Sequence, residues 1–421
     1  MPSYPGLNSS PGGWRGTDAL LFSAIGTLAE RGDRLNADSH VLLKEPISHS
    51  PAKHGERIEV LDGLRAVACL AVVGYHYFSR WTPPLNAIDL YPYGATLAAT
   101  PLFSFGYMGV QLFFLVSGFV ITLTLSRCET ARDFAIRRIA RLFPAMLLAA
   151  SATFLVVRVM RPHYWTMQAC NFLPSLTFTH PYIYRHLFGI DCQFMDGVYW
   201  SLFVEVRFYA WSALLYFGVS RTKFLRNAGL LVSVAIAVQL FKPFFPGSAL
   251  LGLADWIFFP RYAPWLFSGV ASYFVWQDRS NRLAWLIVLE GMVANLTYSI
   301  SDPGGAEWAV VLALYALFTA FALRLGILRI FGGPLLTSIG AASYSLYLLH
   351  ENIGVTAIGA LAAAFGVSGA ASIPVAFIVA VALVLASIAI YRLYENPARH
   401  LLTRWGNRLL RVDRSAGEVR G

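Results

Sequence analysis

The sequence predicts an all-α protein, a polytopic integral membrane helix bundle, and three observations lead to this prediction. Hydrophobic residues make up 57% of the 421 residues, and only 13% are charged, whereas soluble domains carry about 25% charged residues. The mean hydropathy is +0.55. Apolar runs of about 20 residues, long enough to cross a bilayer as helices, recur along the chain and alternate with short basic loops.

Apolar runs bounded by turn residues and charges predict about ten transmembrane helices. The sixth run is interrupted by Asp255, Pro260 and Pro264, so it is either one broken helix or two elements. The ten runs fall near residues 60–78, 103–125, 139–159, 198–218, 227–241, 250–276, 284–299, 307–323, 336–363 and 372–392.

The distribution of arginine and lysine sets the predicted orientation. Most basic residues fall in alternate loops and in the C-terminal segment, which the positive-inside rule assigns to the cytoplasm together with both termini. We therefore expect three parts: a poorly ordered cytoplasmic tail (1–57), a transmembrane domain (58–402) and a basic cytoplasmic tail (403–421). The opposite loops hold only Arg80, Arg161, Arg185 and Lys242.

The net charge of +10 does not predict a nucleic-acid partner. The basic residues lie in short loops between apolar runs, and no soluble segment is long enough to present a basic face. The partner that this pattern does predict is a lipid bilayer. The oligomeric state does not follow from the sequence.

Two of the four cysteines, Cys170 and Cys192, fall in the long predicted outer loop. They would form a disulfide if the outside is oxidising and their geometry permits it. Two unpaired thiols fit the sequence equally well, because spacing alone does not fix geometry.

Three titratable side chains lie deep within predicted spans, where a charge costs about 2.5–3.5 kcal/mol on insertion scales. At about 1.5 Å per residue, His76 lies about 24 Å from the inner boundary, and His350 and Glu205 lie about 18–20 Å from it. Groups from three spans therefore share one layer, although depth does not fix their lateral distance. Buried structural hydrogen bonds would explain one such residue, whereas a set of three favours a catalytic chamber.

Arginines gather at the opposite, inner end of the bundle. Arg65 lies eleven residues before His76 on one helical stripe, about 16 Å away along the axis. Arg137, Arg138 and Arg141 open the third span, and their guanidinium groups suit phosphate oxygens. On charge alone these arginines are better explained as a topology signal at a helix end.

Six motifs stand out along the chain. They are LDGLRAVACLAVVGYHYF (Leu61–Phe78), FFLVSGFVIT (Phe113–Thr122), RRIARLFP (Arg137–Pro144), YWSLFVEVRFYA (Tyr199–Ala210), SYSLYLLH (Ser343–His350) and YENPARHLL (Tyr394–Leu402). In these motifs and their order the chain resembles the acyltransferase-3 family of membrane-bound O-acyltransferases, of the polysaccharide acetylase type. One departure is that Val206 and Arg207 follow Glu205, where the family often has a polar pair.

The resemblance implies a cytoplasmic acyl-CoA donor, with acetyl as the expected acyl group, and a hydroxyl acceptor on an envelope or exported saccharide. It implies no metal, and it places the protein in a bacterial inner membrane. The inner arginines would then bind the CoA phosphates.

Within that expectation His76 is the general base, because a weakly nucleophilic alcohol needs one at neutral pH. Glu205 would orient its imidazole or stabilise the charged form, as the carboxylate of a triad does. His350 would bind acceptor, protonate the leaving thiolate or be structural, and either histidine could carry a transient acyl group. The hydroxyls of Ser117, Tyr344 and Tyr347 are candidates for stabilising the oxyanion.

Two other function classes fit part of the sequence. A proton-coupled multi-span transporter would also use intramembrane His and Glu with a broken helix, but no paired repeat symmetry is visible. A non-catalytic partner in a polysaccharide assembly complex is the third alternative.

Overall fold

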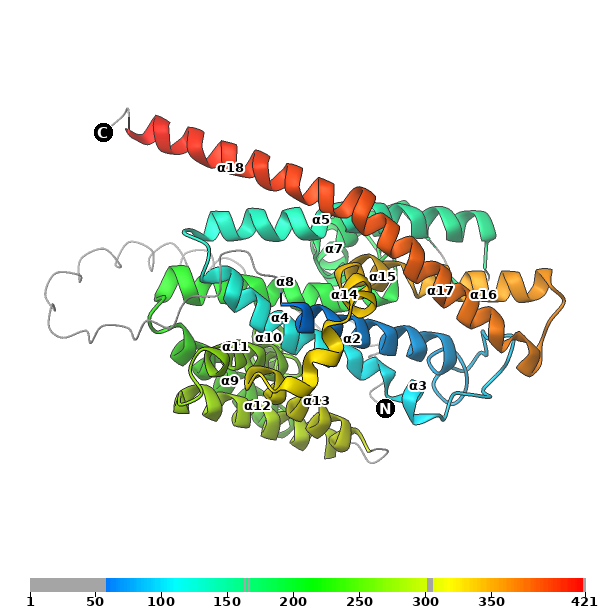
Figure 1. The fold of residues 1–421 in the computed structure, drawn as a ribbon, viewed down its shortest axis with the longest axis horizontal. Helices are drawn as coiled ribbons and strands as arrows, with labels where there is room; N and C mark the ends of the chain where they lie inside the picture. Colours follow the sequence, from blue (N-terminus) through cyan, green and yellow to red (C-terminus); the bar gives the residue numbers. More distant parts are fainter. Residues whose placement is uncertain (1–57, 163, 166, 301–305, 419–421) are drawn as a thin grey trace, which may run out of the picture. The chain divides into compact units, whose positions relative to one another are not determined.

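The computed structural model describes residues 58–162, 164–165, 167–300 and 306–418. Within these residues the chain is helical and forms no β-strand (Figure 1). The predicted tail at 1–57 lies outside them. The longer helices are α2 (Glu59–Phe78), α4 (Gly109–Leu125), α5 (Ala131–Met160), α8 (Trp200–Ala213), α9 (Phe224–Phe241), α11 (Ala263–Gln277), α12 (Arg282–Ile300), α13 (Glu307–Ala322), α16 (Asn352–Ala364), α17 (Ile373–Ile390) and α18 (Asn396–Glu418). The shorter ones are α3 (Pro101–Ser104), α6 (Phe172–Thr177), α7 (Pro181–Phe188), α10 (Ala249–Phe258), α14 (Pro334–Ala341) and α15 (Ser343–Leu349).

Five helical segments in the described part of the chain are long and apolar enough to cross a membrane. Two bent helix pairs raise the number to seven if each pair is one span. The helix α2 has 20 residues but also carries Asp62, Arg65 and His76, so it is less apolar than these. The five segments are Pro101–Leu125, Ala131–Met160, Gly197–Val219, Phe224–Phe244 and Gly369–Arg408. The two bent pairs are Glu307–Ala322 with Gly326–Gly332 and Ser343–Leu349 with Asn352–Ala364.

The interrupted sixth run forms two helices, α10 and α11, rather than one broken span. Phe259, between them, adopts a left-handed backbone conformation. The side chain of Arg207 on α8 donates to the carbonyl of Trp256 at 2.6 Å and lies over the rings of Phe203 and Phe259. This guanidinium, whose partner the sequence did not reveal, therefore holds the α10–α11 turn against α8.

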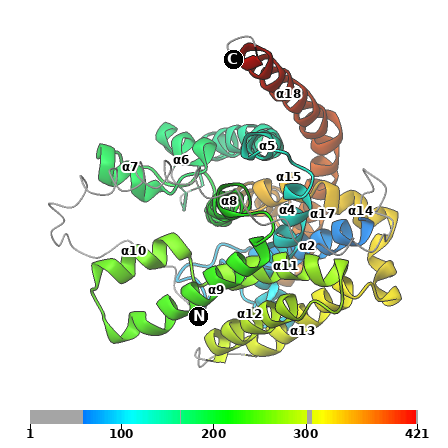
Figure 2. The same cartoon turned by 90° about the vertical axis from the view of Figure 1, so that its left-hand side faces the viewer.

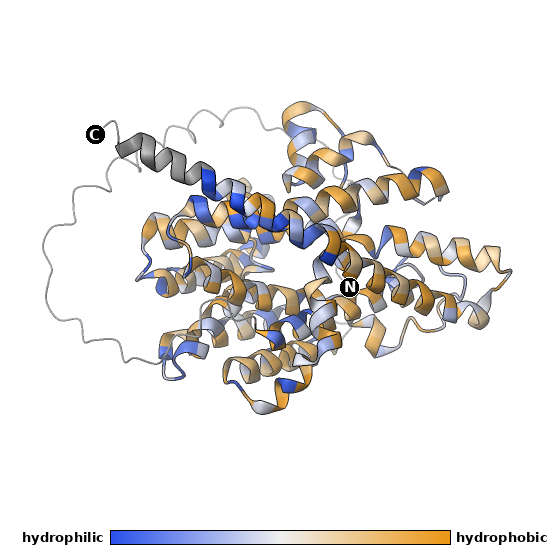
Figure 3. Cartoon of the chain, turned by 45° about the horizontal axis from the view of Figure 1, so that its top comes forward, coloured by the Kyte–Doolittle hydropathy of each residue, from blue (hydrophilic) through white to orange (hydrophobic). Residues whose placement is uncertain are grey.

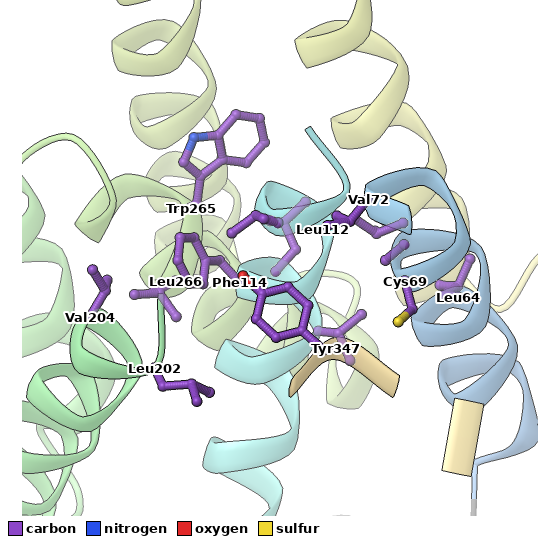
Figure 4. Packing of buried hydrophobic residues seen from close by; sticks show 14 of the residues in the cluster. Leu64, Cys69, Val72, Leu112, Phe114, Leu202, Val204, Trp265, Leu266 and Tyr347 are labelled. Atoms are coloured by element: carbon purple, nitrogen blue, oxygen red, sulfur yellow. The ribbon is translucent and has the colours of Figure 1, made fainter. Parts of the chain in front are cut away.

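The helix α4 lies at the centre of the buried packing, between α2 on one side and α8 and α11 on the other (Figure 4). Figure 2 shows α11 and its neighbours α9, α12 and α13 grouped together in the same part of the bundle. The contact between α4 and α11 depends on small residues. A Cβ at Gly118 would lie 1.9 Å from the carbonyl oxygen of Leu266, and one at Gly269 would lie 2.1 Å from that of Leu115. Glycine at both positions therefore lets the two backbones touch, as small residues do in membrane helix pairs.

The arginine-bearing start of α5 is fixed by local hydrogen bonds. The hydroxyl of Thr130 caps the helix by accepting from the backbone N–H of Asp133 at 3.1 Å. Asp133 in the first turn suits the positive end of the helix dipole. At the other end of the chain, α17 continues into α18, and hydrophilic residues are frequent along the coloured part of α18, whereas hydrophobic residues dominate the bundle (Figure 3).

Substituting Gly269 with alanine is expected to destabilise the protein by about 1–3 kcal/mol, because the added methyl group overlaps the α4 backbone. Thermal unfolding of the purified protein in one detergent measures this. Gly252→Ala on α10, where an added Cβ meets nothing within 4 Å, is the matched control and should unfold at or above the wild-type temperature. Equal unfolding temperatures for Gly269→Ala and wild type would contradict the close α4–α11 contact.

Candidate active site

Two buried histidines from distant parts of the sequence meet inside the bundle. His76 lies in the last turn of α2, and His350 lies directly after α15. His350 Nε2 is 3.1 Å from His76 Nδ1. His76 is 9% exposed and His350 is fully buried. The sequence placed both residues in one layer, and the structure brings their rings into contact.

Hydrogen bonds to backbone carbonyls define where the protons of this pair lie. His350 Nδ1 is 2.8 Å from the carbonyl oxygen of Tyr347, which only accepts, so Nδ1 carries a proton. In a neutral ring Nε2 is then the acceptor. His76 Nδ1 faces both this nitrogen and the carbonyl oxygen of Val72 at 2.9 Å, so it is also a donor. The remaining nitrogen, His76 Nε2, is therefore the basic atom of the pair.

The pair exists because the helix breaks at His350 and Glu351, where α15 and α16 meet at an angle of 61°. Buried backbone groups freed by such a break need other partners. The hydroxyl of Tyr199 donates to the carbonyl of Leu348 at 3.3 Å. The carbonyl of His350 still accepts from the backbone N–H of Gly354 at 3.1 Å, and the hydroxyl of Tyr77 is its second donor at 2.9 Å.

The loop before α8 also supplies hydrogen-bond acceptors for the groups at the break. The backbone N–H of Asn352 donates to Asp196 Oδ2 at 3.0 Å, and its side-chain amide donates to the carbonyl of Met195 at 3.3 Å. These bonds and the tyrosine hydroxyls hold the broken helix in place.

Sequence reasoning missed a carboxylate in this site. Glu351 is 3% exposed, and its Oε1 is 3.4 Å from His76 Nε2. An available signal was that Glu351 is itself a charged residue near the middle of an apolar run. On a straight helix it would point about 100° away from His350, and the break is what lets both side chains face His76.

A separate cationic pocket lies along α4, α5 and α8. It encloses about 700 Å³ of empty space, counting its open mouth. Arg65, Arg138 and Arg141 all line it, and the buried Nε of Arg138 has no hydrogen-bond partner among the described residues. The other lining residues are Val110, Phe113, Phe114, Val116, Ser117, Val120, Ile121, Leu142, Ser201, Leu202, Glu205, Tyr209, Ser343, Tyr344 and Tyr347.

Glu205 belongs to this pocket and not to the histidine pair. Its Oε1 accepts hydrogen bonds from the hydroxyls of Ser117 and Tyr209, each at 2.5 Å. The carboxylate that lies within ion-pair distance of His76 is that of Glu351. The depth of Glu205 matched that of His350, but its lateral position, facing α4, is set by packing.

The side chain of Arg137 does not line the pocket, unlike those of Arg138 and Arg141. Its Nε donates to Asp133 Oδ1 at 2.9 Å, and its side chain is 41% exposed. It is absent from the residues that line the pocket. Of the four arginines singled out from the sequence, three therefore share the pocket and one forms a surface pair with the first turn of its own helix.

Tyr347 connects the two regions. It lines the pocket, its hydroxyl lies 2.8 Å from that of Ser201, and its ring centroid is 5.6 Å from that of His350. Tyr347 and then His350, whose ring centroid is 4.9 Å from that of His76, therefore lead from the pocket to the basic nitrogen.

The three hydroxyls considered for stabilising the oxyanion all have hydrogen-bond partners. Ser117 donates to Glu205, Tyr344 donates to the carbonyl of Leu142, and Tyr347 bonds Ser201 and the carbonyl of Val198.

All four cysteines, Cys170 and Cys192 included, are free thiols.

These features define a helical membrane protein with a candidate active site enclosed by its helices. The acyltransferase domain model of the acyltransferase-3 family matches residues 58–392. The chain belongs to this family, and the resemblance seen in its motifs is confirmed. The match covers every histidine, carboxylate and arginine described above.

Similar proteins carry related names. The chain is 26% identical to the peptidoglycan O-acetyltransferase OatA of Listeria monocytogenes over 335 residues, which cover 70% of this chain and 49% of that protein. It is 24% identical over 380 residues to a putative O-acetyltransferase of Staphylococcus aureus, covering 80% and 57% of the two chains. A putative peptidoglycan O-acetyltransferase of Bacillus subtilis, YrhL, is 30% identical over 212 residues, or 45% of this chain and 30% of that one.

The chain therefore spans about half the length of the Listeria and Staphylococcus proteins. No solved structure matches it.

Tyr77→Phe is expected to destabilise the protein by about 0.5–1.5 kcal/mol, because it removes one of the two hydrogen bonds that the buried carbonyl of His350 accepts, the other coming from the backbone N–H of Gly354 at 3.1 Å. Unfolding in detergent, compared with the wild type, measures the loss. Tyr394→Phe, at a tyrosine that is 36% exposed, serves as the control and should be neutral. A Tyr77→Phe protein as stable as the control would show that the break does not depend on this bond.

Proposed function

We propose that the protein is a membrane O-acyltransferase that moves an acyl group, expected to be acetyl, from cytoplasmic acyl-CoA to a hydroxyl of an envelope or exported saccharide. One observation carries the proposal: a pocket lined by three arginines is linked, through Tyr347 and His350, to a buried, basic histidine, His76. The names of the relatives, which include peptidoglycan O-acetyltransferases, support an acetyl group and a saccharide acceptor.

The arginine pocket supplies the donor site in this proposal. Arg65, Arg138 and Arg141 would hold the CoA phosphates through charge-assisted hydrogen bonds, for which Arg138 Nε is unoccupied in the described structure. The pantetheine arm would extend along α2 from Arg65 towards His76, about 16 Å along the helix axis. Glu205, fixed by Ser117 and Tyr209, would order the arginines before the donor binds.

The histidine pair supplies the base. A hydroxyl oxygen attacks the thioester carbonyl carbon, a C–O bond forms, and the C–S bond breaks with its electrons on sulfur. The hydroxyl proton passes to His76 Nε2 and then to the CoA thiolate. His350 keeps His76 in the reactive tautomer by accepting from Nδ1–H, the role that the carboxylate has in a serine triad.

The proposed orientation rests on the charge pattern, and the proposed location rests on the family. We place ten spans in a bacterial inner membrane, with both termini and the arginine pocket on the cytoplasmic side. The predicted runs that fall outside the five to seven candidate spans, such as 60–78 and 284–299, coincide with α2 and α12. Family membership favours this enzyme over a proton-coupled carrier and over a non-catalytic assembly partner.

Arg138→Ala is expected to raise the KM for acetyl-CoA about 10- to 100-fold, the effect of removing a hydrogen-bonded charge from a bound phosphate. Initial rates in proteoliposomes with varied acetyl-CoA measure it. Arg137→Ala is the matched control, one residue away but paired with Asp133, and should stay within about twofold of wild type. Equal KM values for the two variants would contradict the proposal that this pocket binds the donor.

His76→Ala is expected to lower transfer of labelled acetyl from acetyl-CoA to an envelope glycan by about 10²–10⁴-fold, the usual contribution of a general base. Membrane vesicles containing wild-type or variant protein at matched insertion levels measure it. Undiminished labelling by the variant would show that His76 is not the base. Proton-driven uptake without CoA dependence would support the carrier instead.

A further inference from the structure

We propose that Glu351 is a positioning residue for His76, and that its carboxylate stabilises the imidazolium which forms when His76 takes the hydroxyl proton. This inference rests on the proposed function and assigns to Glu351 the role that was expected of Glu205 from the sequence. His76 Nδ1 is committed as a donor to Val72 and His350, so Nε2 presents a lone pair, and Glu351 Oε1 lies 3.4 Å from it.

His76 Nε2 and Glu351 Oε1 are both acceptor atoms, so this arrangement is most stable when a proton lies between them. In the absence of such a proton, the lone pair of His76 Nε2 and the charge on Glu351 Oε1 repel each other in a buried, weakly screened site. The proton released by the acceptor hydroxyl relieves that repulsion, because the imidazolium and the carboxylate then form an ion pair. The charge that develops on His76 during transfer is therefore neutralised where it forms.

The structure also explains how the carboxylate is held. Glu351 sits at the helix break, which Asp196 secures by accepting from the backbone N–H groups of Val198 and Asn352. Gly197 lies against its other oxygen, since a Cβ there would be 3.1 Å from Glu351 Oε2. A larger residue at 197 would move the carboxylate without removing it.

Asp196 is buried beside Glu351 but faces the backbone. Its two oxygens accept from the N–H groups of Val198 and Asn352, while Glu351 Oε1 faces His76 Nε2. Burial, reinforced by the neighbouring Glu351 carboxylate, raises the pKa of Asp196 well above its usual value. The two acids thus differ in position: Asp196 secures the helix break and Glu351 faces the base.

Glu351→Gln tests the proposal, because it keeps the shape of the side chain and removes its charge. We expect kcat for acetyl transfer to fall about 100-fold or more, as loss of charge in a triad acid does, with the KM for acetyl-CoA within about twofold of wild type. Glu290→Gln is the matched control, a carboxylate on α12 that accepts from Ser233, and should leave both constants unchanged. Unchanged kcat in Glu351→Gln, or a raised KM alone, would overturn the proposal.

A second variant guards against a merely structural effect. Gly197→Ala displaces the carboxylate and retains its charge, so we expect a smaller fall in kcat, between those of wild type and Glu351→Gln. A fall in Gly197→Ala that equals or exceeds the one in Glu351→Gln would indicate damage to the helix break and count against the proposal.

A readout that needs no turnover separates this proposal from the proposed function. In protein labelled with ¹⁵N-histidine, the resonance of His76 Nε2, identified by its loss in His76→Gln, should shift in Glu351→Gln and not in Glu290→Gln. If wild type transfers no acetyl group but this shift occurs, the proposed function fails and the pairing of Glu351 with His76 stands. An unshifted resonance contradicts the pairing whatever the activity.

Discussion

The candidate site depends on one break in a buried helix, at His350 and Glu351. In an apolar bundle an unpaired backbone group costs several kcal/mol, so a break persists only where side chains satisfy it. Here the hydroxyls of Tyr77 and Tyr199 and the carboxyl group of Asp196 do so. Because the chain bends by 61° at this point, two consecutive titratable side chains both reach His76 on α2.

The polar side chains inside the bundle lie in two regions with different electrostatics, the arginine pocket and the histidine pair. The arginine pocket gathers positive charge near Glu205, and its open volume suits an extended anion. The two histidine side chains are almost inaccessible to solvent, and hydrogen bonds to backbone carbonyls fix their tautomers. Tyr347 stands between them and contacts both. Such an arrangement separates the binding of a charged donor from proton transfer, which works best in a dry, pre-ordered site.

Much of this arrangement could be predicted from the sequence, because helices convert residue number into depth. The regular rise of α2 placed Arg65 and His76 in different layers, and His350 shared the deeper one. Lateral position could not be predicted in this way: Glu205 has the right depth, but packing of α8 against α4 turns it towards Ser117. Glu351 was missed because only the bend directs it to His76. The arginines show the same limit, since Arg137 follows its local partner Asp133 while Arg138 and Arg141 face inwards.

The central claim is that one donor molecule joins the arginine pocket to His76, and a structure with a bound donor tests it most directly. The measurement is a cryo-electron microscopy map of the protein with a non-hydrolysable acyl-CoA analogue. The account predicts phosphate density beside Arg138 and Arg141, and the acyl carbon next to His76 Nε2. Density for the analogue outside this pocket, or an acyl group remote from His76, would contradict it.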